Sequence, residues 1–152
     1  MPPSTEPFDA AQDLADAPRI GGRQRPRDAA TLILTRARPG GPEVLMGRRA
    51  PGHVFMAAKW VFPGGRVERT DHTAASATDL APADAGRLAR EVTPRRARAL
   101  ALAAVRETFE ETGLLLAEPA PSSAVAGPWR EFRAVGALPD LAVLILTGAP
   151  LD

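Results

Sequence analysis

The sequence predicts a single α/β domain, and three observations support this. A β-branched and aliphatic run at 30–35 has the composition of a strand, and short apolar segments bounded by Gly or Pro follow it. Segment 95–112 consists mainly of Ala, Leu, Arg and Glu, which are strong helix formers. The chain has 152 residues, which is long enough to bury one core and too short for two ordinary domains.

The composition excludes several classes of function. The 19 Lys and Arg against 18 Asp and Glu leave a formal net charge of +1, so neither a nucleic acid polymer nor an anionic membrane is expected as the main partner. The absence of Cys excludes disulfides, thiolate catalysis and zinc–thiolate sites. No apolar stretch reaches the ~18–20 residues of a membrane span, and the N-terminus lacks a secretory signal, so we expect a cytoplasmic protein.

The chain divides at about residue 28. Residues 1–28 are polar and rich in Pro, and their basic cluster at 19–27 follows no helical or strand period. We therefore expect a disordered N-terminal arm at 1–28 and a folded domain at 29–152.

The first part of the domain is predicted to form strands. A turn at 38–42, with two glycines between two prolines, separates the strand at 30–35 from a second strand at 43–49 that pairs with it. The apolar run 60–62 ends at Pro63-Gly64-Gly65, which is typical of a strand entering a tight turn.

The long helix is the clearest element of the sequence. Thr93 suits its N-cap, Pro94 its first position, and Gly113 a left-handed C-terminal cap. Its apolar stripe, at helical spacing, is Leu102, Val105 and Phe109. The other expected elements are an excursion at 69–93 with a short helix at 82–92, a buried strand at 114–117, an edge strand or turn at 129–134, and a strand at 141–147.

Three glutamates of the long helix form the main chemical signal. Glu107, Glu110 and Glu111 are at i, i+3 and i+4, which places their carboxylates on one helical face. Clustered acids repel one another, which raises at least one pKa, and one arginine, Arg106, cannot neutralise all three. Such a face suits Mg²⁺ or Mn²⁺, which prefer oxygen ligands. A solvated acidic face is the alternative.

The segment Phe62-Pro63-Gly64-Gly65 is a second signal. It fits a tight turn after a strand, and it also fits a backbone segment whose carbonyl or N–H groups approach a metal or phosphate, which glycine permits.

Together these two elements resemble the Nudix hydrolase family, whose motif, the Nudix box, is G-x5-E-x7-R-E-U-x-E-E-x-G-U with U aliphatic. Residues 106–114 match its second half, with Thr108 at the first U position. Phe62–Gly65 matches the segment that opens the box in many members. The resemblance covers about residues 29–117 and implies an α/β/α sandwich with a mixed β-sheet.

Two departures from the family pattern stand out. The box places its Arg fourteen positions after its opening Gly, whereas Arg106 lies 41 positions after Gly65, so the excursion at 69–93 is an insertion within the box. A subgroup resembling the peroxisomal coenzyme A diphosphatases carries such an insertion. The first Glu of the box then has no clear counterpart. Counting eight positions back from Arg106, as the box requires, reaches Arg98, and Glu68 or Glu91 are the possible substitutes.

The second departure is that only 39 residues follow Gly113, which predicts a sandwich that is incomplete at its C-terminal end.

The resemblance implies hydrolysis of the diphosphate linkage of a nucleoside diphosphate joined to another moiety, with a small coenzyme A-like or dinucleotide substrate favoured. It implies that Glu107, Glu110 and Glu111 bind Mg²⁺ or Mn²⁺, that one of them acts as base, and that the carbonyl of Gly64 is a further ligand. Arg106 would orient a glutamate. Many members dimerise, so a homodimer is among the expectations.

Two other interpretations stay open. A truncated or degenerate Nudix-like domain would bind metal or a partner without turnover, and a helical interaction module would merely present an acidic face. His53 and His72 are interpreted as surface or loop residues, and Trp60 and Trp129 as core or rim aromatics.

Overall fold

A computed structural model of the chain describes residues 26–48 and 59–145. The described residues belong to two units: residues 47–48 and 59–61 to the first, and residues 26–46 and 62–145 to the second. Residues 1–25 of the arm expected at 1–28 lie outside the described residues. His53 and the last two residues of the strand expected at 141–147 also lie outside them.

The described part of the first unit is one short antiparallel pair. Its strands are β4 (Gly47–Arg48) and β5 (Trp60–Val61), with Gly47 opposite Val61. The side chain of Trp60 is largely exposed, which fits the rim position expected for it.

The second unit contains all the described helices and the remaining strands. Its strands pair as β1 with β6, β2 with β3, and β7 with β8, and every described pairing is antiparallel. In chain order its elements are β1 (Ala29–Thr31), β2 (Thr35–Arg36), β3 (Glu43–Val44), β6 (Gly64–Arg66), the 3₁₀-helix η1 (Arg69–His72), α2 (Pro82–Leu88), α3 (Pro94–Thr112), β7 (Ala117–Pro119), α4 (Arg130–Ala134) and β8 (Ala137–Pro139).

The glycine segment is a strand and not the expected tight turn. Ala30 lies opposite Gly65, and the ladder continues through Leu32 N–H to the carbonyl of Pro63 at 2.9 Å. In an antiparallel pair the hydrogen-bonded residues alternate with residues whose N–H and C=O point the other way. The backbone groups of Gly64 and Arg66 therefore point away from β1, towards the other edge of β6.

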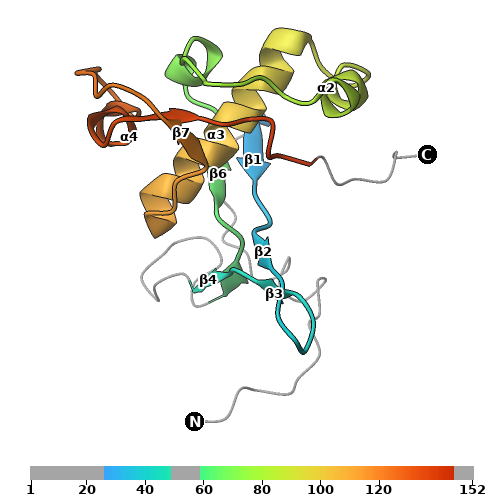
Figure 1. Cartoon of the computed structure of the whole chain (residues 1–152). Coiled ribbons are helices and arrows are strands. Elements are labelled where there is room, and N and C mark those ends of the chain that lie inside the picture. The colour runs from blue at the N-terminus through green and yellow to red at the C-terminus, as the bar shows by residue number, and fades with distance from the viewer. Residues whose placement is uncertain (1–25, 49–58, 146–152) are drawn as a thin grey trace, which may run out of the picture. The chain divides into compact units, whose positions relative to one another are not determined.

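Helix α3 begins and ends as the sequence predicts. The Thr93 side chain accepts a hydrogen bond from the backbone N–H of Arg96 at 3.4 Å, and Gly113 adopts the left-handed conformation with φ of 74°. The helix packs against β1, β6, η1 and α2 (Figure 1). Leu102 and Val105 are fully buried and Phe109 packs against the same core, so the predicted apolar stripe is confirmed.

The core joins α3 to α4. Rings of Phe109 and Phe132 meet edge-to-face with centroids 5.1 Å apart, and Trp129 meets Phe132 in the same way at 5.3 Å. Trp129 is therefore a core aromatic. The buried cluster consists of Ala101, Leu102, Val105, Trp129, Phe132, Ala137 and Leu141.

Several short elements differ from their predictions. The strand expected at 30–35 is interrupted after Thr31, because its two halves pair with different strands, β6 and β3. The strand expected at 43–49 is likewise two strands, and only β3 pairs with β2. The short helix expected at 82–92 ends at Leu88.

The predictions after α3 fail more often. Leu114 and Leu115 are 50% and 45% exposed, so the apolar run 114–117 is not a buried strand, and β7 begins only at Ala117. Segment 129–134 contains the helix α4, and the described part of 141–147 is a turn in which Leu144 N–H donates to the carbonyl of Leu141. Short apolar runs do not distinguish strands from buried turns or helices by periodicity.

Among the described helices, none is both long and apolar enough to cross a membrane.

Two leucines near α3 test this burial pattern. Leu102→Ala removes a fully buried side chain and should lower the free energy of unfolding by about 2–5 kcal/mol. Leu114→Ala removes a half-exposed side chain and should cost much less. Urea denaturation monitored by circular dichroism measures both values. Equal losses would contradict the structure and favour the buried strand at 114–117.

Candidate active site

Arg106 lies at the centre of the candidate site. Its side chain is only 2% exposed, and its Nε and Nη2 donate to the two carboxylate oxygens of Asp71, each at 3.0 Å. Nη2 also donates to the carbonyl of Arg66 at 2.9 Å. Nη1 donates to Glu107 at 2.9 Å and to Glu110 at 3.1 Å. A guanidinium carries five N–H groups, so every donor of Arg106 is used.

The charge of Arg106 is stabilised by this environment. Burial disfavours the charged guanidinium, but the hydrogen bonds and charge of Asp71, followed by the charges of Glu107 and Glu110, outweigh that effect. The pKa of Arg106 therefore lies above its ordinary value, and the residue stays positively charged.

Asp71 is a site residue that the sequence interpretation missed. It is fully buried in η1 and accepts four hydrogen bonds: two from Arg106, one from the backbone N–H of Glu68 at 2.8 Å and one from the indole N–H of Trp129 at 2.9 Å. The signal was present, because Asp71 follows Gly65 after five intervening residues, which is the place of the first acid in the box.

Neither of the predicted substitutes for that acid, Glu68 and Glu91, binds Arg106 through its side chain among the described contacts. Arg98, at the counted position, donates to Asp79 and to the carbonyl of Ala74, and Glu91 is exposed beyond the end of α2. Glu68 takes part through its backbone N–H. The split of the box stays a prediction, and Asp71 lies inside the excursion expected at 69–93 as an insertion.

The outer edge of β6 is hydrogen bonded to α3 at two points. Arg106 donates to the carbonyl of Arg66, and the N–H of Gly64 donates to a carboxylate oxygen of Glu111 at 3.2 Å. Gly65 allows a further close approach, because a Cβ placed there would lie 2.4 Å from the carboxyl carbon of Glu107. Glycine at 65 thus makes room for a glutamate of the site.

Glycine at 64 is required by the neighbouring strand. Its φ is 156°, and a Cβ there would lie 2.4 Å from the carbonyl oxygen of Ala30 on β1. In an antiparallel strand, the N–H and C=O of one residue point to the same edge. The carbonyl of Gly64 therefore points to the edge of β6 where its N–H contacts Glu111.

The three glutamates lie together, as the sequence predicts. Glu107 and Glu110 share the Nη1 group of Arg106, and Glu111 contacts the N–H of Gly64. Burial raises the pKa of Glu110, Arg106 opposes that shift, and the charges of Glu107 and Asp71 add to it. The expected rise in one pKa is confirmed, with burial as its main cause and repulsion between acids as a smaller one.

The carboxylate oxygens of the site are the kind of ligand that a hard divalent cation prefers, but they do not converge on one point. Three carboxylates, those of Asp71, Glu107 and Glu110, contact the one guanidinium, so negative charge exceeds positive charge in this cluster. The carboxylate of Glu111 contacts the N–H of Gly64 beside it, and oxygen donors are what Mg²⁺ and Mn²⁺ prefer. Within residues 26–48 and 59–145, no three acidic or His side chains converge closely enough to form a metal site. The metal-binding roles of Gly64, Glu107, Glu110 and Glu111 stay predictions.

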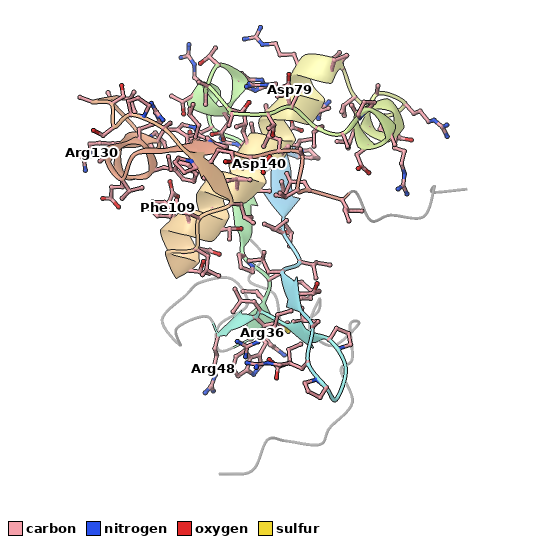
Figure 2. The ribbon with its side chains drawn as sticks, in the orientation of Figure 1. Arg36, Arg48, Asp79, Phe109, Arg130 and Asp140 are labelled. Atoms are coloured by element: carbon pink, nitrogen blue, oxygen red, sulfur yellow. The ribbon has the colours of Figure 1, made fainter. Side chains whose placement is uncertain are left out.

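The labelled side chains of Figure 2 show how other parts of the second unit approach α3. Phe109 projects from α3, and its ring contacts Phe132 of α4, the helix that begins at Arg130. Asp79, in the segment between η1 and α2, accepts a hydrogen bond from Arg98 of α3 at 3.2 Å. This segment and α4 are thus both attached to the helix that carries the glutamates.

Comparison with known proteins supports the Nudix-like fold. The chain is similar to the crystal structure of a NUDIX hydrolase from Alicyclobacillus acidocaldarius, with a TM-score of 0.58 and 25% sequence identity. The match covers 80% of this chain and 60% of that protein, so the chain spans less than two thirds of its length. No family model and no curated protein matches the chain. The chain therefore has an α/β, Nudix-like fold.

Gly65→Ala tests the close approach of Glu107 to β6. The added methyl group should displace the Glu107 carboxylate and break its hydrogen bond to Arg106, lowering the free energy of unfolding by about 1.5–3 kcal/mol. Gly86→Ala is the matched control, because a Cβ there meets nothing within 4 Å and lies in α2. That variant should gain up to about 1 kcal/mol. Urea denaturation checks both, and an unaltered Gly65→Ala protein would contradict the geometry.

The raised pKa of Glu110 predicts a pH-dependent effect on stability. A carboxyl group whose pKa is higher in the folded state favours folding below its unfolded pKa, and that contribution is lost as pH rises through the folded pKa. Glu110→Gln should therefore raise Tm at pH 7, and the gain should shrink as the pH falls below the ordinary pKa of glutamate. Thermal unfolding at several pH values measures this.

The control for that experiment is Glu118→Gln, at an exposed position of β7. It should leave Tm nearly unchanged at each pH. A loss of Tm in Glu110→Gln at pH 7 would contradict the predicted sign.

Proposed function

We propose that this chain is a metal-dependent hydrolase that cleaves the diphosphate linkage of a nucleoside diphosphate joined to another moiety. The observation that carries the proposal is the set of three glutamates at one end of α3, held against β6 by Arg106 and by the N–H of Gly64. The Nudix-like fold supports it, because the similar structure is that of a NUDIX hydrolase.

The glutamates would supply the ligands. Glu107, Glu110 and Glu111 would hold Mg²⁺ or Mn²⁺, together with the carbonyl of Gly64, which faces the same edge. A bound divalent ion neutralises charge on the diphosphate and lowers the pKa of an attacking water.

Arg106 acts as a positioning residue in this proposal. Its Nη1 group holds Glu107 and Glu110, and it has no free N–H left to bind substrate. One of the glutamates accepts the proton of the attacking water. Glu110 suits that role best, because its raised pKa lets it take up a proton at higher pH than an ordinary carboxylate.

The proposed substrate is a small molecule. The insertion between Asp71 and Arg106 resembles that of the coenzyme A diphosphatase-like subgroup, so coenzyme A-like compounds or dinucleotides are the first substrates to test. A homodimer acting in the cytoplasm is part of the same proposal.

One observation favours a second candidate function, binding of metal or a partner without turnover. Among the described residues, the carboxylates of the site do not converge on one point.

Conservative substitutions of the glutamates test the proposal. Glu110→Gln and Glu111→Gln keep the side-chain volume and remove the negative charge, so each should lower kcat by about 100-fold or more. The assay follows release of nucleoside monophosphate from coenzyme A, NADH and a nucleotide sugar, with and without Mg²⁺ or Mn²⁺. Glu118→Gln, exposed on β7, is the matched control and should keep wild-type activity.

The outcomes separate the two functions. Full metal-dependent activity in both glutamate variants would overturn the assignment of the site. Metal binding by calorimetry without hydrolysis of any substrate would select the domain without turnover.

A further inference from the structure

We propose that Trp129, a residue that follows the box, is a positioning residue that orients the site glutamates through Asp71 and Arg106. The inference deepens the proposed function and rests on it for the role of the glutamates as metal ligands. It names a part of the chain that the motif does not contain.

A continuous chain of hydrogen bonds connects Trp129 to the glutamates. The indole N–H donates to Oδ1 of Asp71 at 2.9 Å, and the same carboxylate accepts Nε and Nη2 of Arg106 at 3.0 Å. The remaining terminal nitrogen of Arg106 then holds Glu107 and Glu110. Two residues, Asp71 and Arg106, therefore connect Trp129 to the glutamates through consecutive hydrogen bonds.

The indole N–H completes the coordination of a buried carboxylate. A carboxylate offers about four acceptor positions, and Asp71 accepts four hydrogen bonds, two at each oxygen. Asp71 has no exposed surface, so water does not replace a lost donor without disturbing the surroundings. Removal of the indole N–H would leave one acceptor position of a buried charge unfilled, which favours a shift of Asp71.

A shift of Asp71 would be transmitted to the glutamates by the shape of the guanidinium. The group is planar, and its two parallel bonds to Asp71 fix the plane in which Nη1 lies. The direction of Nη1 then sets where the carboxylates of Glu107 and Glu110 are held.

Trp129 is itself held firmly. It is 4% exposed, and its indole packs edge-to-face on Phe132, which packs on Phe109 of α3. Its carbonyl accepts the backbone N–H of Arg133 in the turn of α4, the helix on which Figure 2 labels Arg130. The donor is therefore pre-positioned by the core, which is what a residue that orients others requires.

Trp129→Phe is the test variant, because it keeps an aromatic ring and removes the N–H. Two controls accompany it. Trp60→Phe makes the same change at an exposed tryptophan, and Phe132→Leu weakens the same aromatic cluster without touching the hydrogen-bond chain. Circular dichroism and thermal unfolding confirm that each variant is folded.

Two readouts are measured on each protein. The first is the Nε–H signal of Arg106 in nitrogen-15 NMR of metal-free protein, which should be protected from exchange in the wild type and lost in Trp129→Phe. The second is Mn²⁺ affinity by calorimetry, which should fall about tenfold in Trp129→Phe. Both controls should keep the Arg106 signal and an Mn²⁺ affinity within about twofold of the wild type.

The outcomes distinguish this inference from the proposed function. A protected Arg106 signal in Trp129→Phe, or an equal loss of the signal or of Mn²⁺ affinity in Phe132→Leu, would overturn the role of Trp129. If the wild type hydrolyses none of the substrates but the two readouts change as predicted, the proposed function fails and the role of Trp129 stands. If the wild type binds no Mn²⁺, the metal-binding part of the inference is overturned and the Arg106 signal alone decides the rest.

Discussion

The buried guanidinium of Arg106 is the interaction on which the site depends. A buried charge is stable only when it is paired and its hydrogen-bonding groups are satisfied. Arg106 meets both conditions by binding three parts of the chain: the backbone of β6, Asp71 in η1, and Glu107 and Glu110 in its own helix. All of these partners bind the one side chain of Arg106. Loss of any one of them leaves an N–H group of the buried guanidinium without an acceptor.

The site keeps more negative charge than the fold needs. Asp71 is enough to pair Arg106, yet Glu107 and Glu110 also contact the Arg106 guanidinium. Among the described residues, Glu111 accepts a hydrogen bond from the N–H of Gly64 and pairs with no cationic side chain. Such an excess disfavours folding in the absence of a cation. The pKa of Glu110 is raised mainly by burial, and the charges of Glu107 and Asp71 add to that rise. Residues retained at a cost to stability are typical of functional sites, which agrees with a cation-binding role for this face.

Local signals in the sequence predicted the helix and its glutamates, because caps, composition and spacing are properties of neighbouring residues. Thr93, Gly113 and the stripe at Leu102 and Val105 are examples. The missed features depend on distant partners. Trp129 reaches Asp71 across 58 positions of sequence, and Leu114 looks buried by composition although half of it is exposed. Asp71 itself was detectable by its spacing from Gly65, but its side chain is shorter than the expected Glu.

A long segment separates the buried acid of the site from the arginine that it pairs with. Thirty-four residues separate Asp71 from Arg106 where the family pattern has seven. Closing the longer loop costs only about 1.4 kcal/mol more, because loop-closure entropy grows with the logarithm of length. The segment between Asp71 and Arg106 also contacts α3, where Arg98 donates to the carbonyl of Ala74, to Ser76 and to Asp79, so these contacts offset part of that cost. The acid and the arginine therefore meet in a two-point pair although 34 residues lie between them. The site therefore requires that Asp71 and Arg106 pair, and it does not require a particular length of the segment that joins them.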